Sequence, residues 1–226
     1  MKKDYWSAHT LLINKETAQK FAAYMKKYPV LYKQLASIVK ENTLPSVRKP
    51  LIVDVGVGPG LLLKELQKKF PKAKIIGVDP SKNMLILAKL NVGNSHVTLF
   101  EPLLATAEYI PLQNESVDIV VSRFSLTYWK NPIESFNEIH RVLKQSGKIV
   151  FEVLNKDFPG WKLFVIKIRM LFNSASSNII RYHIDAYETA YTIDSFRNIL
   201  KKTGFEVESA EGTKKGWQFI VVAKKK

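Results

Sequence analysis

Cysteine is absent from this chain of 226 residues. Its absence excludes disulfide bonds, thiolate metal ligands and thiol nucleophiles together, and fits the reducing cytoplasm. The chain also lacks a run of about 18 apolar residues that would suggest a membrane-spanning helix. Its first residues lack the apolar stretch of a signal peptide. We therefore expect a cytoplasmic protein, and no residue pattern suggests a metal site.

Acidic residues are scarce: 20 Asp and Glu face 35 Lys and Arg, which gives a net charge of +15. Such an excess attracts anionic partners such as nucleic acid or acidic lipid. The lysines are spread along the chain and form no basic stripe, so a lysine-rich solvated surface is favoured over a dedicated polyanion site. The dispersed lysines argue against nucleic acid as a partner, although the charge of +15 does not exclude it, and the oligomeric state is left open.

Short β-branched runs alternate with helical segments after two N-terminal helices. This order is the signature of an α/β fold with a doubly wound, Rossmann-like parallel sheet. The length suits one domain, residues 1–226. The expected strands are 51–55, 74–79, 97–100, 117–121, 148–153, 205–208 and 217–222. The expected helices among them are 61–70, 80–88, with Pro80 in the first turn, 132–143 and 192–203.

A glycine-rich turn, residues 56–60, lies between the first strand and the next helix. Glycine permits a tight turn there and lets a ligand approach the backbone. The third glycine comes one residue too early for the dinucleotide fingerprint, and no Gly-Lys-Ser/Thr follows as a P-loop requires. Asp54, just before the turn, suits a ligand with a positive amino group better than a pyrophosphate.

Asp79 ends the second expected strand, 19 residues after Gly60. In doubly wound sheets a carboxylate at this place accepts hydrogen bonds from a ribose diol. The alternative is that Asp79 caps the helix that follows. Ser122 ends the fourth strand, at the carboxyl edge where ligands of open α/β sheets bind. The agreement of strand, spacing and glycine turn favours the ribose role.

Three segments, 54–60, 77–84 and 139–147, resemble the ordered motifs of class I S-adenosylmethionine-dependent methyltransferases, most of all the ubiquinone/menaquinone-type small-molecule branch. The resemblance covers residues 50–155 and, more loosely, 190–226. It implies S-adenosyl-L-methionine as the cofactor. It also implies a mostly parallel seven-stranded sheet with an antiparallel last strand, plus N-terminal helices.

The resemblance further implies which residues hold the cofactor. The glycine turn would hold the methionine end and Asp79 the ribose, while Met84 would lie beside the adenine. Ala107 and Glu108 resemble the adenine-side segment, but Thr106 replaces its usual acidic residue, so either Glu108 or backbone groups must meet the adenine amine. The predicted cofactor-binding residues are Asp54, Gly56, Gly58, Gly60, Asp79, Pro80, Met84, Ala107, Glu108 and Ser122.

Two segments outside the motifs are assigned to substrate access. Residues 1–45 are expected to form a helical lid, and residues 155–191 an acceptor-side insertion. Methyl transfer needs mainly positioning and exclusion of water, so the resemblance carries over no catalytic residue. His9 and His183 are candidate general bases, whereas His140 lies in a helix and is expected to be structural.

Residues 158–172 form an apolar stretch too short to span a bilayer. Its apolar residues cover most of a helical wheel, which favours a buried helix capping the sheet. Two alternatives remain. The stretch can be a lid over an apolar acceptor pocket, or an interfacial helix whose cations meet lipid phosphates in a peripheral membrane contact.

The expected function is methyl transfer from S-adenosylmethionine to a small, lipophilic acceptor. The absence of cysteine argues against cytosine-C5 methylation through a thiolate, and residues 122–125 lack the Asn/Asp-Pro-Pro-Tyr motif of amino-group methylation. Two alternatives stay open: a methyltransferase acting on RNA or protein, and a non-catalytic cofactor-binding protein of the same fold.

Overall fold

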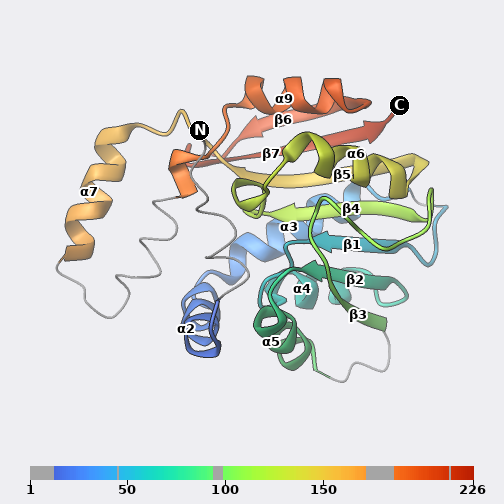
Figure 1. Cartoon of the computed structure of the whole chain (residues 1–226), viewed down its shortest axis with the longest axis horizontal. Coiled ribbons are helices and arrows are strands. Elements are labelled where there is room, and N and C mark those ends of the chain that lie inside the picture. The colour runs from blue at the N-terminus through green and yellow to red at the C-terminus, as the bar shows by residue number, and fades with distance from the viewer. Residues whose placement is uncertain (1–12, 45, 94–98, 172–185, 214) are drawn as a thin grey trace.

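A seven-stranded sheet forms the centre of the molecule, with helices on both faces (Figure 1). The computed structural model describes residues 13–44, 46–93, 99–171, 186–213 and 215–226. The strand order is β3-β2-β1-β4-β5-β7-β6, with β1 to β5 parallel and β7 antiparallel to both neighbours. This confirms the predicted fold class. The strands are β1 Leu51–Val55, β2 Lys74–Asp79, β3 Leu99–Leu104, β4 Val117–Arg123, β5 Leu143–Leu154, β6 Phe205–Gly212 and β7 Gln218–Lys225.

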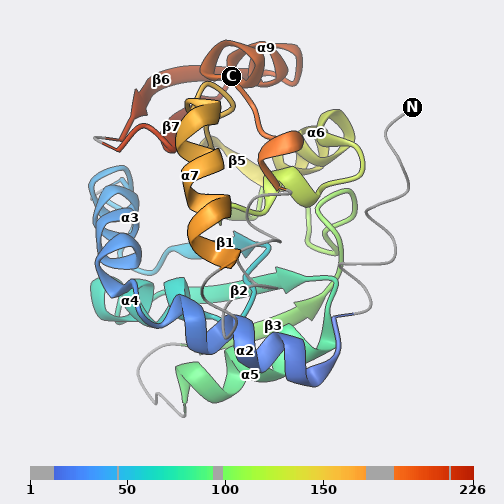
Figure 2. The same cartoon turned by 90° about the vertical axis from the view of Figure 1, so that its left-hand side faces the viewer.

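The helices divide between the two faces of the sheet (Figure 2). Side chains of α3, α4 and α5 share one buried cluster with the sheet, and side chains of α6 and α9 share the other. Ile52 of β1 belongs to the first cluster and the adjacent Val53 to the second, which is why β1 is a continuous apolar run. The described helices are α2 Lys15–Met25, α3 Pro29–Glu41, α4 Leu61–Lys69, α5 Lys82–Val92, α6 Pro132–Val142, α7 Gly160–Leu171 and α9 Ile193–Lys202, with a short 3-10 turn, η1, at Leu126–Tyr128.

Strands β4, β6 and β7 end later than the sequence-based expectation, and three further boundaries differ from it for a physical reason. Strand β3 extends through Pro102, which an edge strand tolerates because one side of it makes no ladder hydrogen bonds. Strand β5 begins at Leu143, and its pairing with β4 shifts register between Val117 and Ile119. The placement of Pro80 in a first helical turn is wrong: Ser81 caps α5, its Oγ accepting the Met84 N–H, and Pro80 lies before the cap.

The two segments assigned to substrate access differ in burial, because the first contains a helix packed in the core and the second an exposed helix. Helix α3 buries Leu35, Ala36 and Val39 in the core, so it is structural, and the lid stays a prediction for the residues before it. Residues 1–12 lie outside the described part of the chain. Helix α7 leaves large apolar side chains in solvent, so the favoured expectation of a buried helix is wrong. No helix in the described residues has the length and hydropathy needed to cross a membrane.

Candidate cofactor site at the carboxyl edge of the sheet

The glycine turn between β1 and α4 adopts a backbone that side chains rarely permit. Gly56, Gly58 and Gly60 have φ of +75°, +52° and +75°. A Cβ on Gly56 would lie 2.2 Å from the Ser125 Cβ, and one on Gly60 would lie 2.8 Å from the Ala88 Cα. A Cβ on Gly58 would meet no atom of the described residues within 4 Å. Gly56 and Gly60 therefore permit close packing, while Gly58 borders open space that a ligand can occupy.

Asp79 ties this turn to the next helix. Its Oδ2 accepts the Gly58 N–H at 2.9 Å, and its Oδ1 accepts the Ser81 N–H at 2.9 Å. Because the cap of α5 is the Ser81 hydroxyl, the alternative that Asp79 caps that helix is wrong. Burial raises the pKa of Asp79 to about 6, although the two N–H donors act in the opposite direction. The carboxylate is accordingly held in place beside the turn, with lone pairs left for further donors.

Asp54 lies at the end of β1, beneath the glycine turn, and is buried. Loss of solvation, reinforced by the charge of Asp79, raises the pKa of Asp54 to about 8, against the opposing effect of Arg123. Two buried carboxyl groups thus share one region. Such a pair favours a cationic ligand, since a positive charge would stabilise the ionised form of both.

Ser122 supports the turn from β4. Its Oγ donates to the Val55 carbonyl at 2.8 Å and lies 2.5 Å from the Ser125 Oγ. The Ser125 Oγ in turn donates to Val55 at 2.9 Å and accepts the Trp129 Nε1–H at 3.1 Å. These bonds hold the end of β1 against the segment after β4. The cofactor contact assigned to the buried Ser122 stays a prediction.

The residues assigned to the adenine side lie around β3, α5 and the segment after β3. Met84 and Ala107 are buried. The Glu108 Oε1 accepts the N–H groups of Lys130 at 2.9 Å and Asn131 at 3.1 Å, so one of its oxygens already has partners. The adenine contacts assigned to Met84, Ala107, Glu108 and Pro80 stay a prediction.

A buried ion pair at the ends of β4 and β5 was missed by the sequence interpretation. The Arg123 Nε lies 2.6 Å from the Glu152 Oε2, and Gln218 of β7 donates to the other oxygen of Glu152. The Arg123 guanidinium lies over the rings of Tyr32 and Phe124, 4.5 and 4.2 Å from their centroids. The signal was Glu152 within the otherwise apolar run 149–154, because a charge there requires a partner.

The Arg123 Nη2 is buried and has no hydrogen-bond partner in the described residues. Arg123 also acts electrostatically on Asp54, whose pKa it lowers. Burial raises the pKa of Tyr32 to about 12, aided by the charges of Glu152 and Asp54 and opposed by Arg123. The region under the glycine turn therefore holds a cation and carboxyl groups within electrostatic reach of one another.

An aromatic cluster adjoins this ion pair at the carboxyl edge. Phe124, directly after β4, has φ of +57°, an uncommon conformation for a side-chain-bearing residue, held by its N–H bond to the Glu152 carbonyl. Its ring lies 5.3 Å from that of Trp217, and the cluster includes Leu154, Ala186 and Ala190. Tyr187 packs against the cluster and donates its hydroxyl to the Trp217 carbonyl. The site thus has an apolar wall beside a polar floor.

Of the histidines considered, only His140 is described by the structure. It lies beside Gly204, where a Cβ would come within 2.9 Å of its Nε2, and packs edge-on against Phe205. Burial lowers the pKa of His140, with a further contribution from the charge of Lys225. His140 is structural, as predicted. His9 and His183 lie outside the described residues.

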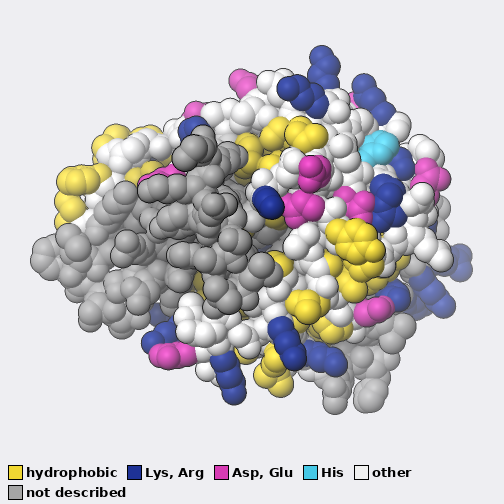
Figure 3. Space-filling view, viewed as in Figure 1, with side chains coloured by type: hydrophobic (Ala, Val, Ile, Leu, Met, Phe, Trp, Pro, Cys, Tyr) yellow, Lys and Arg dark blue, Asp and Glu magenta, His cyan; other side chains and the backbone are white. Residues whose placement is uncertain are grey.

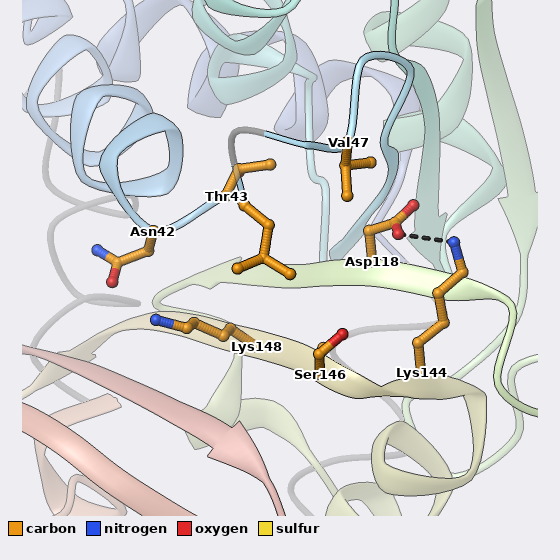
Figure 4. Close-up of a pocket in the computed structure, with 9 residues that line it drawn as sticks. Asn42, Thr43, Val47, Asp118, Lys144, Ser146 and Lys148 are labelled. Carbon is orange, nitrogen blue, oxygen red and sulfur yellow. Dashed lines mark hydrogen bonds and ion pairs between the residues drawn. The ribbon is translucent and has the colours of Figure 1, made fainter.

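A pocket at the opposite edge of the sheet, where β4 and β5 begin, holds none of the predicted residues (Figure 4). There the Lys144 Nζ pairs with the Asp118 Oδ1 at 2.6 Å, while Oδ2 accepts the Leu51 N–H. The pair joins the starts of three strands. Ligands of open α/β sheets bind at the carboxyl ends, so we interpret this pocket as structural.

Comparison with known families places this site in context. Residues 53–151 match the family described as Methyltransferase domain. The chain is 29% identical over 149 residues to a malonyl-[acyl-carrier protein] O-methyltransferase from a Marinomonas species, covering 65% of this chain but only 54% of that protein. It is 30% identical over 168 residues to a demethylmenaquinone methyltransferase from Chlorobaculum parvum, covering 70% of this chain and 67% of that protein.

A solved structure has the same fold. The crystal structure of a SAM-dependent methyltransferase from Aquifex aeolicus matches with a TM-score of 0.63 at 22% sequence identity, covering 86% of this chain and 97% of that one. The matched domain begins at Val53, just before Asp54, and ends in β5, so it includes the glycine turn, Asp79 and Ser122.

Proposed function

We propose that this chain, which belongs to the class I S-adenosylmethionine-dependent methyltransferase family, transfers the methyl group of that cofactor to a small, lipophilic acceptor. The observation that carries the proposal is the glycine turn: the Gly58 N–H is bound to Asp79, open space borders Gly58 among the described residues, and Asp54 is buried in the strand that precedes the turn. A ligand with a positive amino group and a ribose diol suits these groups.

Different residues of the chain would bind different parts of the cofactor. Asp54 would face the amino group, and the unpaired Arg123 Nη2 would face the carboxylate of the same amino-acid end. Opposite charges beside each other suit a zwitterion. Asp79 would accept the ribose hydroxyls with the lone pairs that Gly58 and Ser81 leave free. The adenine would lie toward Met84, Ala107 and Glu108, with Pro80 and Ser122 at the margins of the site.

The cofactor supplies an electrophilic methyl group on a positively charged sulfur. The protein has to place the acceptor in line with it and to exclude water. The aromatic cluster of Phe124, Trp217 and Tyr187 supports a lipophilic acceptor, because it gives the carboxyl edge an apolar wall. An acceptor that loses a proton would need a base, for which His9 and His183 remain the candidates.

One relative, the demethylmenaquinone methyltransferase of Chlorobaculum parvum, is named for a lipophilic quinone acceptor, which supports this proposal. We also propose that the enzyme acts in the cytoplasm, where the absence of cysteine carries no cost in stability. The dispersed lysines give no support to an RNA acceptor.

The test is transfer of a labelled methyl group from S-adenosylmethionine into a fractionated cell extract by the full chain. We expect label in the lipid-soluble fraction, and no label with Gly58→Val, which places a branched side chain in the cofactor site. Label in RNA or protein would contradict the acceptor class. Cofactor binding without label in any fraction would contradict the catalytic function.

A further inference from the structure

Helix α7 carries a row of exposed apolar side chains. Trp161 and Phe164 are 67% and 62% exposed, and Val165 and Ile168 are also exposed. Their spacing of three, four and seven residues places them on one face of the helix. Figure 3 shows the hydrophobic side chains of this part of the molecule at its outer edge, at the left of the view.

The sequence of this segment supplies cations and no anions. From residue 158 to residue 171 there is no Asp or Glu, whereas Lys162, Lys167 and Arg169 are present. The Lys162 Nζ lies over the rings of Trp161 and Phe158, at 5.5 and 5.8 Å from their centroids. A lysine beside exposed aromatic rings is the arrangement found where a helix meets the boundary between water and lipid.

The position of α7 relates this surface to the candidate site. The helix follows β5; it lies at the left of Figure 1, on the side to which the parallel strands point, and in front of the sheet in Figure 2. The glycine turn and the aromatic cluster lie at those same strand ends. A surface in contact with α7 therefore faces the edge of the sheet at which the cofactor and the acceptor are expected.

The size of the exposed row argues against a second copy of the chain as its partner. Two exposed aromatic rings and two partly exposed aliphatic side chains present on the order of 400 Å². Each partner of a standard protein interface buries about 800 Å². Charge favours an anionic partner instead, because the helix has only cations and the whole chain carries a net charge of +15.

We propose that α7 lies in the surface of a bilayer that contains anionic lipid. Trp161, Phe164, Val165 and Ile168 enter the boundary of the acyl chains, and Lys162 meets the phosphates of the headgroups. The bilayer contact holds the carboxyl edge of the sheet at the lipid surface. That a lipophilic acceptor reaches the site from the bilayer rests on the proposed function, whereas the contact itself does not.

The test is co-sedimentation of the full chain with vesicles of phosphatidylcholine, with and without phosphatidylglycerol. We expect binding to the anionic vesicles and a loss of more than tenfold in affinity for the double variant Trp161→Ser, Phe164→Ser, since two inserted aromatic rings are removed. The matched control is Ile86→Ser, Leu90→Ser, which removes two exposed apolar residues of α5 and is expected to leave vesicle binding unchanged.

Other outcomes separate the alternatives. Absence of binding to anionic vesicles would overturn the proposal, and equal binding by the α7 variant would assign the contact to charge elsewhere on the chain. Sedimentation velocity that shows a dimer abolished by the α7 variant would assign the surface to a second copy. Calorimetric titration with S-adenosylhomocysteine provides an independent readout: unchanged affinity in the α7 variant shows an intact fold, and loss of the methyl-transfer function would leave the vesicle result standing.

Discussion

Gly58 differs from the other glycines of its turn, because a Cβ there would contact no described residue, whereas a Cβ on Gly56 or Gly60 would clash with a neighbour. Gly56 and Gly60 are required by the packing of Ser125 and Ala88 against them. A glycine in the left-handed region with open space beside it is needed either for the turn alone or for a ligand. A substitution there separates these two possibilities.

Gly58→Val is expected to weaken binding of S-adenosylhomocysteine by more than tenfold, measured by calorimetry, because a branched side chain enters the open space. The left-handed backbone also costs stability, about 1–2 kcal/mol. The control is Gly93→Val at the end of α5, where φ is +69° and a Cβ would meet no described residue within 4 Å. That variant should lose stability and keep its affinity; equal affinity in both variants would contradict the assignment of the turn.

Asp54 and Asp79 could be identified from the sequence because their positions relative to strand ends and glycines are local information. The effect of Asp79 on the pKa of Asp54 could not be predicted from the sequence, since it depends on how deeply the fold buries both carboxyl groups. The hydrogen bond from Gly58 to Asp79 joins residues 21 apart in sequence and likewise depends on the parallel pairing of β1 with β2.

At the scale of strands, Arg123 and Glu152 join β4 to β5 at directly paired positions. Both side chains are buried, so neither charge has water as an alternative partner. The sequence could not predict this pair, because the register of β4 with β5 shifts between Val117 and Ile119.

Arg123→Met is expected to destabilise the protein by about 3–5 kcal/mol in urea unfolding, because Glu152 keeps a buried charge without a partner. The double variant Arg123→Met, Glu152→Met should recover most of that stability. Its affinity for S-adenosylhomocysteine should remain low, because the cation assigned to the cofactor's carboxylate is still missing. Recovery of affinity together with stability would contradict that assignment and leave Arg123 a purely structural role.

Hydrophobic periodicity predicted some of the helices correctly and failed to predict the burial of one. Helices α4, α6 and α9 agree with the expected ranges because each has a cap or stop and one buried face; Thr192, for example, accepts the Ser195 N–H as the N-cap of α9. Helix α7 does not follow the expectation, since apolar composition alone cannot distinguish a side chain buried by a neighbour from one left in solvent.

At the scale of the whole molecule, the raised pKa values make both stability and binding depend on pH. Asp54 and Asp79 bind protons more tightly in the folded chain than in the unfolded one. Their stabilising contribution is therefore complete below about pH 4 and is lost as the pH rises through 6 and 8. A cationic ligand requires the opposite, ionised form.

We expect the affinity for S-adenosylhomocysteine to rise between pH 5.5 and 7.5, at most about tenfold per pH unit for each proton released. Calorimetry in buffers of different ionisation enthalpy would detect the released protons. Asp54→Asn should bind weakly with a flatter pH profile and should make the ligand-free protein more stable at pH 8. An unchanged profile in that variant would show that Asp54 does not face the ligand's charge.

The sequence by itself determined the order of strands and helices, the glycine turn and the two carboxylates, because each depends on neighbours within a few residues or on a repeated spacing. The tertiary structure decided which of these groups meet. Only the assembled sheet places Asp79 on the Gly58 amide, buries Arg123 against Glu152 and leaves the apolar row of α7 uncovered. Burial and long-range pairing are properties of the packed chain, and they set the charge, shape and exposure on which the proposed function depends.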